Sequence, residues 1–488
     1  MSMNTEIREL EPKALWNKFA DLNAVPRPSK KEERVIEFIK NFGNKLGLKT
    51  IVDEVGNVII LKDATPGMEN RKKIVLQSHL DMVHQKNNDT EFDFDTQGIE
   101  MYVDEDWVRA KGTTLGADNG LGVATIMAIL ESNDIPHPAI EALFTIDEET
   151  GMTGAKGLKS DLLEGEILLN LDTEEDDEIG IGCAGGVDIT ASKTYTEENL
   201  AENMQVYSLK VKGLKGGHSG MDIIKGLGNA NKLMTRLLID ADNFEVRICE
   251  IYGGGLRNAI PRESEVIFGI PESNAADFKN VLQEKIADIK AEYAALEPKL
   301  AIELKESSSS GKIMDKKAQI EVLRALTAVH NGVYRMSPEI EGLVETSNNV
   351  AKVRLKEGQV EIKCLTRSSV ESSKDDLANS IKAVFELAGF KVSMSGEYPG
   401  WAPNRDSAIL KTLDEIYQKI NGEKANIAAC HAGLECGIIG SHYPEMDMIS
   451  FGPTIRGAHS PDERASISSA KKYWNFILEV LKNIPEKN

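Results

Sequence analysis

Short apolar runs alternate with helical patterns from about residue 30 to about residue 185. The runs have the length of buried strands, and we expect strands at residues 49–52, 58–61, 73–78, 142–146 and 167–171. Residues 120–131 carry apolar side chains around most of a helical circumference and predict a buried helix. Asp118 and Asn119, which precede this helix, are residue types that favour an N-cap. The alternation predicts an α/β fold with a mostly parallel mixed sheet.

The pattern changes near Gly185, and strands then alternate with amphipathic helices as far as about residue 395. Two strand-rich runs are each followed by a helix, at residues 250–271 and 275–291 and then at 343–367 and 374–388. The two halves resemble one another, so we expect a doubled α+β unit. The Ser-rich segment 306–312 between the halves predicts a loop.

The α/β pattern returns after Pro399, with a helix expected at 407–420, a strand at 446–450 and a last helix at 466–483. The first domain is therefore interrupted in the sequence. We expect this domain to consist of residues 1–186 and 397–488 and an inserted α+β domain to occupy residues 187–396.

The composition of the 488 residues, with 41% hydrophobic and 28% charged, is typical of a soluble globular protein with more than one core. There are 57 Lys and Arg against 78 Asp and Glu, which gives a formal net charge of −21. This excess repels nucleic-acid phosphates and anionic lipids, and the sequence has no basic patch to offset it. We therefore expect neither a nucleic acid nor a membrane as a partner.

Residues 1–24 mix acids, bases and a proline and do not form the apolar core of a signal peptide. No run of about 18 apolar residues predicts a membrane span, so we expect a cytoplasmic protein. The cysteines lack CxxC spacing, which predicts reduced thiols rather than disulfides. They are Cys183, Cys249, Cys364, Cys430 and Cys436.

Five groups of metal-capable side chains stand at predicted strand ends or in Gly-rich turns. They are His79 with Asp81, Asp118, the run 147–149, Asp172 and His459. Each has an ordinary alternative: a structural strand end, an N-cap for Asp118, a solvated loop for 147–149, and a surface histidine for His459. We assign most of the acidic tract 172–178 to solvated surface.

Taken together, four of the five groups follow predicted strands, at the edge where open α/β sheets bind their ligands. Two histidines with several carboxylates suit Zn²⁺, with Mn²⁺ or Co²⁺ as substitutes. An adjacent glutamate that does not bind the metal would then deprotonate a metal-bound water.

The strings HLDMV, GADNG, DEETG, NLD and GAHS, in this order, resemble the M20 family of di-zinc metallopeptidases. GGHSG at 216–220 resembles the lid motif of that family. The length of the chain and the strings TRSS, YPGW and HAGLECG are similar to the aminoacyl-histidine dipeptidase branch, also called the Xaa-His dipeptidase group. The resemblance covers essentially the whole chain and implies a zinc-peptidase-like catalytic domain interrupted by a lid.

The resemblance implies a role for each matching residue. His79 and Asp172 would hold one zinc, Glu149 and His459 the other, and Asp118 would bridge the two zincs. Asp81 would orient His79, and Glu148 would be the general base that activates a shared water. His218 of the lid would donate to the oxyanion, often from the partner subunit, which also implies a homodimer.

A terminal carboxylate of the substrate is best bound by an arginine, and Arg367 is the candidate. Asn258 and Asn348 are rival matches to the turn that precedes this arginine in the family. His431 and Glu435 either contact an end of the substrate or only shape their loop.

The resemblance implies a cytosolic dipeptidase that cleaves unblocked dipeptides, including Xaa-His substrates such as carnosine. One alternative is a deacylase of N-acyl amino acids within the same family. Another is a metal-stabilised protein that binds peptides without cleaving them, although the intact pair Glu148 and Glu149 speaks against it.

Overall fold

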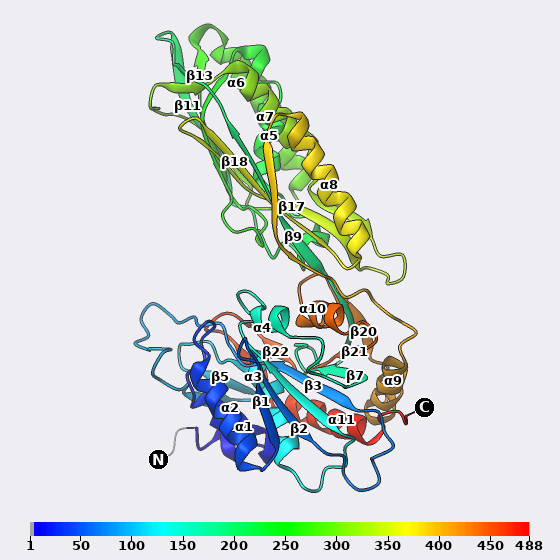
Figure 1. The fold of residues 1–488 in the computed structure, drawn as a ribbon. Helices are drawn as coiled ribbons and strands as arrows, with labels where there is room; N and C mark the ends of the chain where they lie inside the picture. The colour runs from blue at the N-terminus through cyan, green and yellow to red at the C-terminus, as the bar shows by residue number, and fades with distance from the viewer. Residues whose placement is uncertain (1–3, 488) are drawn as a thin grey trace. The chain divides into compact units, whose positions relative to one another are not determined.

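The structure, a computed structural model, describes residues 4–487 (Figure 1). Residues 1–3 and 488 of the predicted first domain lie outside this range. The chain divides into two compact units. Unit 1 comprises Met1–Gly182, Pro403–Ala429 and Leu434–Asn488, and unit 2 comprises Cys183–Ala402 and Cys430–Gly433. Unit 2 is therefore inserted into unit 1 and also takes a short segment from its C-terminal part.

The core of unit 1 is an eight-stranded sheet in the order β1-β2-β6-β3-β7-β21-β8-β20. Its strands are β1 (Lys49–Val52), β2 (Val58–Lys62), β3 (Ile74–His79), β6 (Ile140–Thr145), β7 (Ile167–Asn170), β8 (Glu178–Cys183), β20 (Asn426–Cys430) and β21 (Asp447–Ser450). The central strands β6, β3, β7 and β21 are parallel, whereas β1, β2 and β8 pair antiparallel with their neighbours. The predicted α/β fold with a mixed sheet is confirmed.

The helices of unit 1 are η1 (Ile7–Glu9), α1 (Lys13–Asn23), α2 (Glu33–Lys45), α3 (Ala117–Glu131), α4 (Thr153–Gly157), α9 (Ala408–Asn421), α10 (Glu435–His442) and α11 (Ile467–Lys482). A small sheet is formed by β4 (Met101–Asp104), β5 (Trp107–Ala110), β22 (Ile455–Arg456) and β23 (Arg464–Ser466). The predicted buried helix is α3, which packs against α1 and β3.

The expectation that Asp118 or Asn119 caps α3 is wrong. The N-cap is Gly116, and neither Asp118 nor Asn119 caps this end of the helix with its side chain. Asp118 and Asn119 lie inside the first turn with non-helical backbone angles. Both side chains are therefore directed elsewhere, as described for the site below.

The core of unit 2 is an antiparallel sheet in the order β14-β11-β13-β12-β17-β18-β9-β19, with β16 paired to β17. Its strands are β9 (Gly185–Thr194), β11 (Met204–Lys212), β12 (Arg247–Gly253), β13 (Ser264–Pro271), β14 (Ala301–Glu306), β16 (Gly332–Met336), β17 (Val344–Lys356), β18 (Gln359–Ser368) and β19 (Lys391–Tyr398). The short strands β10 (Glu197–Asn199) and β15 (Lys312–Met314) pair separately.

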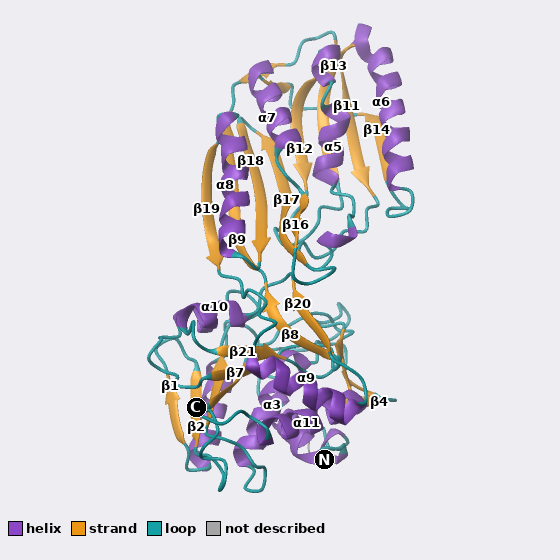
Figure 2. Cartoon of the chain, turned by 90° about the vertical axis from the view of Figure 1, so that its right-hand side faces the viewer, coloured by secondary structure: helices purple, strands orange, loops and turns teal. Residues whose placement is uncertain are grey.

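Four long helices cover one face of this sheet (Figures 1 and 2). They are α5 (Ala230–Leu238), α6 (Glu272–Tyr293), α7 (Lys316–Ala328) and α8 (Glu371–Leu387), and unit 2 also contains η2 (Ile223–Lys225) and η3 (Ala241–Phe244). Strands β12 and β13 precede α6, and β17 and β18 precede α8. The two halves thus have the same order of elements, and they meet where β12 pairs with β17.

Among the described residues, none of the five cysteines forms a disulfide bond. Within residues 4–487, no helix combines the length and the apolar character needed to cross a bilayer.

Candidate active site

Three loops that carry metal-capable residues leave the same edge of the unit 1 sheet. Strand β3 ends at His79, β6 ends two residues before Asp147, and β7 ends two residues before Asp172. These strands run parallel, so the loops after their carboxyl ends meet at one edge. The fold therefore brings together three of the predicted groups: His79 with Asp81, residues 147–149, and Asp172.

Asp118 places one carboxylate oxygen beside each of two histidines. Its Oδ1 atom lies 3.2 Å from Nε2 of His79, and its Oδ2 atom lies 3.2 Å from Nε2 of His459. His459 comes from the loop after β22 and has a positive φ of 65°. The Asp118 carboxylate thus stands between the two histidines, where it can bridge two cations.

Two sets of three potential ligands share this aspartate. In each set the ligand atoms lie within 4.8 Å of one another: the first is His79, Asp118 and Asp172, and the second is Asp118, Glu149 and His459. Nε2 of His79 is 3.5 Å from Asp172 Oδ1, and Nε2 of His459 is 3.0 Å from Glu149 Oε2. These are the pairings that the sequence analysis expected for two metals.

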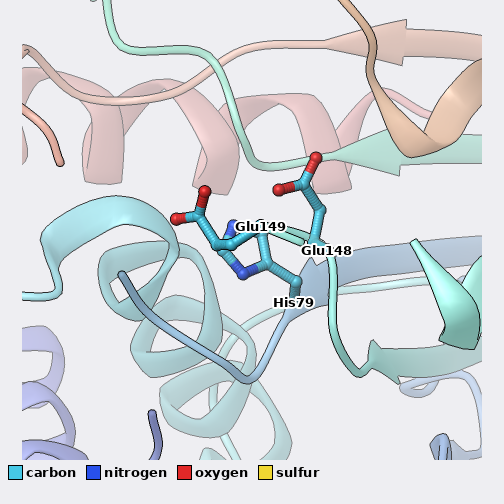
Figure 3. A group of neighbouring side chains, drawn as sticks. All are labelled: His79, Glu148 and Glu149. Carbon is cyan, nitrogen blue, oxygen red and sulfur yellow. The ribbon is translucent and has the colours of Figure 1, made fainter. Parts of the chain in front are cut away.

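Glu148 lies close to these ligands but belongs to neither of the two sets that share Asp118. Its carboxylate forms a third close group with His79 and Glu149, again within 4.8 Å (Figure 3). Figure 3 shows the three side chains gathered at the end of β3. The solvated-loop alternative for residues 147–149 is wrong, since Asp147 is only 4% exposed and the side chain of Glu149 is equally buried.

Asp81 connects the loop after β3 to the loop that carries Glu148 and Glu149. It is fully buried, and one of its oxygens lies 3.4 Å from Nδ1 of His79. The carboxylate also accepts the backbone N–H groups of Glu148 and Glu149, at 3.0 and 3.3 Å, and the Ser29 hydroxyl at 2.8 Å. Asp81 therefore fixes both the ring of His79 and the position of the glutamate pair.

The charges of this site are unbalanced toward the negative. Burial raises the pKa of Glu148 well above its usual value, and the carboxylates of Asp172 and Glu149 add to this shift. Burial likewise raises the pKa of Asp172 to about 6. Hydrogen bonds to Asp118 and Glu149 raise the pKa of His459 to about 11. The site therefore favours the binding of positive charge, as protons or as cations.

The donor set fits a pair of divalent metal ions. Two imidazoles and three carboxylates are ligand types that zinc and related metals accept. Oε1 of Glu149 is buried and has no hydrogen-bond partner among residues 4–487, which fits an oxygen that can bind a cation. The buried carboxylates around it would otherwise repel one another without compensation.

Several residues near the site were not predicted. Glu463, four residues after His459, accepts backbone N–H groups of the Asp118 turn, and Arg27 donates to the Gly116 carbonyl of the same turn. Asn119 donates to the Leu171 carbonyl at 2.7 Å and to the Asp172 carboxylate. Their partners are mostly backbone groups, which leave no signal in the sequence.

The acidic tract 172–178 is less solvated than expected. Of its residues only Asp177 is classed as exposed. Glu175 pairs with Arg456 at 2.7 Å and Asp176 with Lys472 at 2.8 Å. Burial, with the nearby charge of Asp118, raises the pKa of Glu174 to about 8. The assignment to solvated surface therefore fits Asp177 and Glu175, whose side chain is 43% exposed, but not Asp172, whose side chain is 6% exposed.

In unit 2, His218 lies in a tight loop that fixes its ring. Its Nδ1 atom accepts the backbone N–H groups of Gly220 and Met221, at 3.3 and 3.1 Å. Its own backbone N–H donates to Asp222 at 2.7 Å. Because Nδ1 accepts, the proton of a neutral His218 ring is on Nε2, which is then a hydrogen-bond donor.

The two candidate asparagines of unit 2 differ in their surroundings. Asn348 is fully buried, donates to the His330 carbonyl at 2.6 Å and accepts from Thr366 at 3.1 Å. Asn258 is exposed, and its backbone carbonyl accepts the Ser219 N–H at 2.8 Å. The side chain of Asn348 is occupied within the sheet, whereas that of Asn258 faces solvent beside the His218 loop.

Arg367 is 5% exposed at the end of β18 and donates from Nη1 to the Tyr398 hydroxyl at 2.8 Å. Its Nε atom is buried without a hydrogen-bond partner in the described part of the chain. A guanidinium with an unused donor retains capacity for an anion, so this geometry is compatible with the predicted clamp for a carboxylate.

The last two candidates, His431 and Glu435, are both buried and each forms hydrogen bonds within the protein. Nε2 of His431 lies 2.7 Å from the Ser347 hydroxyl, and burial lowers the pKa of His431 to about 3. Glu435 is fully buried, and its Oε2 atom accepts from Gln77 at 2.7 Å and from Thr145 at 2.6 Å. These contacts fit the shaping of the loop, whereas Nδ1 of His431 and Oε1 of Glu435 are buried without a hydrogen-bond partner among residues 4–487, so both interpretations of this pair stay open.

Comparisons with known proteins agree with the motifs. Residues 75–483 match the model of peptidase family M20/M25/M40. The cytosol non-specific dipeptidase of Escherichia coli K12 is 44% identical over 484 residues, which are 99% of this chain and 100% of the relative. The crystal structure of aminoacylhistidine dipeptidase from Vibrio alginolyticus superposes with a TM-score of 0.91, at 44% identity and 99% coverage of each chain. Aminopeptidase PepT of Bacillus cereus, at 15% identity, a TM-score of 0.58 and coverage of 97% of this chain and 99% of its own, shares the fold alone.

The family match begins within the strand that carries His79 and ends beyond His459, so it includes the ligand groups described above. The resemblance to the aminoacyl-histidine dipeptidase branch is confirmed by two relatives at 44% identity that cover nearly the whole chain. The chain therefore belongs to peptidase family M20/M25/M40, in its aminoacyl-histidine dipeptidase branch.

Proposed function

We propose that this protein is a metal-dependent dipeptidase that hydrolyses unblocked dipeptides, including Xaa-His substrates of the carnosine type. One observation carries the proposal: the Asp118 carboxylate stands between His79 and His459, with one oxygen 3.2 Å from each ring. The names of the two relatives at 44% identity, a cytosol non-specific dipeptidase and an aminoacylhistidine dipeptidase, support the choice of a dipeptidase.

Two Zn²⁺ ions fit the donor set, with Co²⁺ or Mn²⁺ as substitutes. His79 and Asp172 would hold the first, Glu149 and His459 the second, and Asp118 both. When bound, the pair would supply Lewis acidity to the scissile carbonyl and to water. The protein's own contribution is to hold the five ligands on loops fixed by hydrogen bonds, so that little reorganisation is needed.

Glu148 is the proposed general base and acid. Its carboxylate is buried beside His79 and Glu149, and burial raises its pKa, so it would hold a proton more tightly than an exposed glutamate does. It would take a proton from the attacking water at a carboxylate oxygen and deliver it to the nitrogen of the leaving amine. Asp81 would keep this carboxylate in place through the Glu148 N–H.

Unit 2 would bind the substrate. We assign the oxyanion contact to Nε2–H of His218, whose other ring nitrogen accepts two backbone N–H groups. Arg367 would bind the terminal carboxylate, with Asn258 as the better placed of the two asparagines. A homodimer and a cytosolic location complete the proposal, the latter supported by the name of the Escherichia coli relative.

A substrate panel on one metal-analysed sample tests this function. L-Ala-L-His and β-Ala-L-His should be hydrolysed and N-acetyl-histidine should not, because the acetylated compound lacks a free amine. Chelation should abolish hydrolysis, and Zn²⁺ should restore it. Faster turnover of N-acetyl-histidine would show a deacylase instead, and binding without turnover would show a peptide-binding protein.

A further inference from the structure

Glu463 binds four consecutive backbone N–H groups at the start of α3. Its carboxylate is 2% exposed. Oε2 accepts from Leu115 at 2.6 Å and from Gly116 at 2.9 Å, and Oε1 accepts from Ala117 at 2.8 Å and from Asp118 at 3.3 Å. The first N–H groups of a helix have no partner within the helix, so this one carboxylate satisfies the turn that no side chain of α3 caps.

The guanidinium group of Arg27 donates to a backbone carbonyl of the same turn. It is 1% exposed, and its Nη2 atom donates to the Gly116 carbonyl. Its Nη1 atom donates to the carbonyls of Leu80 and Asp81, at 3.0 and 3.1 Å, directly after His79. The fit is tight, since a Cβ atom on Gly116, whose φ is +69°, would lie 2.6 Å from Nη2 of Arg27.

These two side chains join three segments that carry potential metal ligands. Glu463 lies four residues after His459 and connects that loop to the Asp118 turn. Arg27 connects the same turn to the segment that follows His79. Asp118 itself has non-helical backbone angles, φ −82° and ψ 111°, so the backbone path of the turn decides where its carboxylate points.

We propose that Glu463 and Arg27 are positioning residues of the metal centre, which together hold the Asp118 carboxylate between His79 and His459. This inference rests on the proposed function, because it assumes that Asp118 bridges two metals. Neither side chain binds a metal or the substrate in this assignment. Their effect is exerted through the backbone of residues 115–118 and 80–81.

Glu463→Gln tests the inference with nearly unchanged size. The amide NH₂ group of glutamine cannot accept, so one of the two pairs of backbone N–H groups would face a donor instead of an acceptor. Competition with a chromophoric chelator should show a loss of Zn²⁺ affinity of about 10- to 100-fold at one or both sites. The visible absorption of the Co²⁺-loaded protein should also change, because it reports ligand geometry and does not depend on turnover.

Two matched variants separate positioning from other effects. Glu141→Gln alters another carboxylate that is 2% exposed, which accepts the N–H groups of Glu164 and Gly165 at 2.9 Å near the opposite end of β6. It should lower thermal stability and leave the Co²⁺ spectrum unchanged. Glu174→Gln alters a neighbouring carboxyl group that interacts electrostatically with Asp118 and His459, and it leaves every backbone hydrogen bond of the turn in place. It should reduce Zn²⁺ affinity less than Glu463→Gln does.

The outcomes distinguish this inference from the proposed function. A wild-type protein that binds neither Zn²⁺ nor Co²⁺ would overturn both. A wild-type protein that binds two ions, with a folded Glu463→Gln variant of equal affinity and spectrum, would overturn the positioning role alone, and so would an equal loss in Glu174→Gln. If Glu463→Gln does not fold, Arg27→Lys decides: a tenfold or greater loss of affinity supports the inference, and unchanged affinity rejects it.

Discussion

Asp81 holds the backbone of Glu148, because its Oδ1 atom accepts the Glu148 N–H at 3.0 Å. The same carboxylate lies 3.4 Å from the His79 ring. One buried side chain thus fixes a potential metal ligand and the proposed general base together. This explains why the HLD and DEE strings, which are far apart in the sequence, act as a single structural element.

Asp81→Asn should impair both metal binding by His79 and proton transfer by Glu148. The asparagine amide would place an NH₂ group against either the Glu148 N–H or the pair of donors from Glu149 and Ser29, which leaves a buried donor unsatisfied at a cost of about 1–3 kcal/mol. We expect kcat to fall at least tenfold and Zn²⁺ affinity to fall as well, by about 10- to 100-fold. Steady-state kinetics and metal titration check both effects.

Asp447→Asn is the matched control for that variant. Asp447 accepts the Ser407 hydroxyl at 2.7 Å and the Ile409 N–H at 3.2 Å, at the start of β21 and away from the ligand loops. It should cost stability without lowering the affinity for metal. Equal metal affinity in wild type and Asp81→Asn would contradict the role of Asp81.

Glu148→Gln should separate chemistry from metal binding. Glu148 belongs to neither of the two ligand sets that share Asp118, so both ions should remain. Loss of the proton acceptor should reduce kcat by about 10²- to 10⁴-fold. Metal content by elemental analysis and kcat on L-Ala-L-His are the two measurements. Glu164→Gln is the control, because Glu164 is an exposed carboxylate at the opposite edge of the sheet, and this variant should leave kcat unchanged. If Glu148→Gln retained the wild-type kcat, Glu148 would not be the general base.

Metal removal should destabilise unit 1. Without cations, Asp118, Glu148, Glu149 and Asp172 lie close together and repel one another, as the raised pKa values of Glu148, Glu149 and Asp172 indicate. A ligand present at 100 times its Kd stabilises the folded state by about 2.7 kcal/mol per site. Calorimetry should therefore show that chelation lowers the Tm for the unfolding of unit 1 and that added Zn²⁺ restores it. Chelator saturated with Zn²⁺ beforehand is the control, and an unchanged Tm at verified zero metal would refute the expectation.

Much of the fold was accessible from the sequence because the central strands are buried on both faces. Every residue in β3, β6 and β7 is buried, and their sequences are short runs of mostly apolar residues, which predict strands directly. The small sheet of β4, β5, β22 and β23 was not predicted, because strands such as Met101–Asp104 are only four residues long and mostly not buried. Its pairing also joins segments more than 300 residues apart, which no local pattern reveals.

In the site, too, features set by nearby residues could be predicted from the sequence, and contacts between residues far apart in the sequence could not. The potential ligands could be recognised in the sequence because each is a side chain of characteristic type directly after a strand or in a Gly-rich turn. Glu463 could not, because its partners are backbone N–H groups more than 340 positions away, which have no residue-specific signature. Asp118 was assigned as a possible cap for the same reason: only the fold shows that Glu463 satisfies the end of the helix and leaves the Asp118 carboxylate available.

Glu435 should give the protein a pH-dependent stability that Glu435→Gln removes. Burial raises its pKa from 4.5 to about 8, although hydrogen bonding to Thr145 opposes the shift. Between these values the folded protein holds a proton that the unfolded chain has lost, so stability falls as the pH rises through this window. At about 1.4 kcal/mol per pKa unit the effect is on the order of 5 kcal/mol above pH 8. The metal-free protein should therefore lose thermal stability from pH 5 to pH 9 more steeply than the variant, whose neutral amide can still accept from Gln77 and Thr145. Calorimetry of both proteins across this range checks the difference, and parallel profiles would show that Glu435 is not protonated in the folded state.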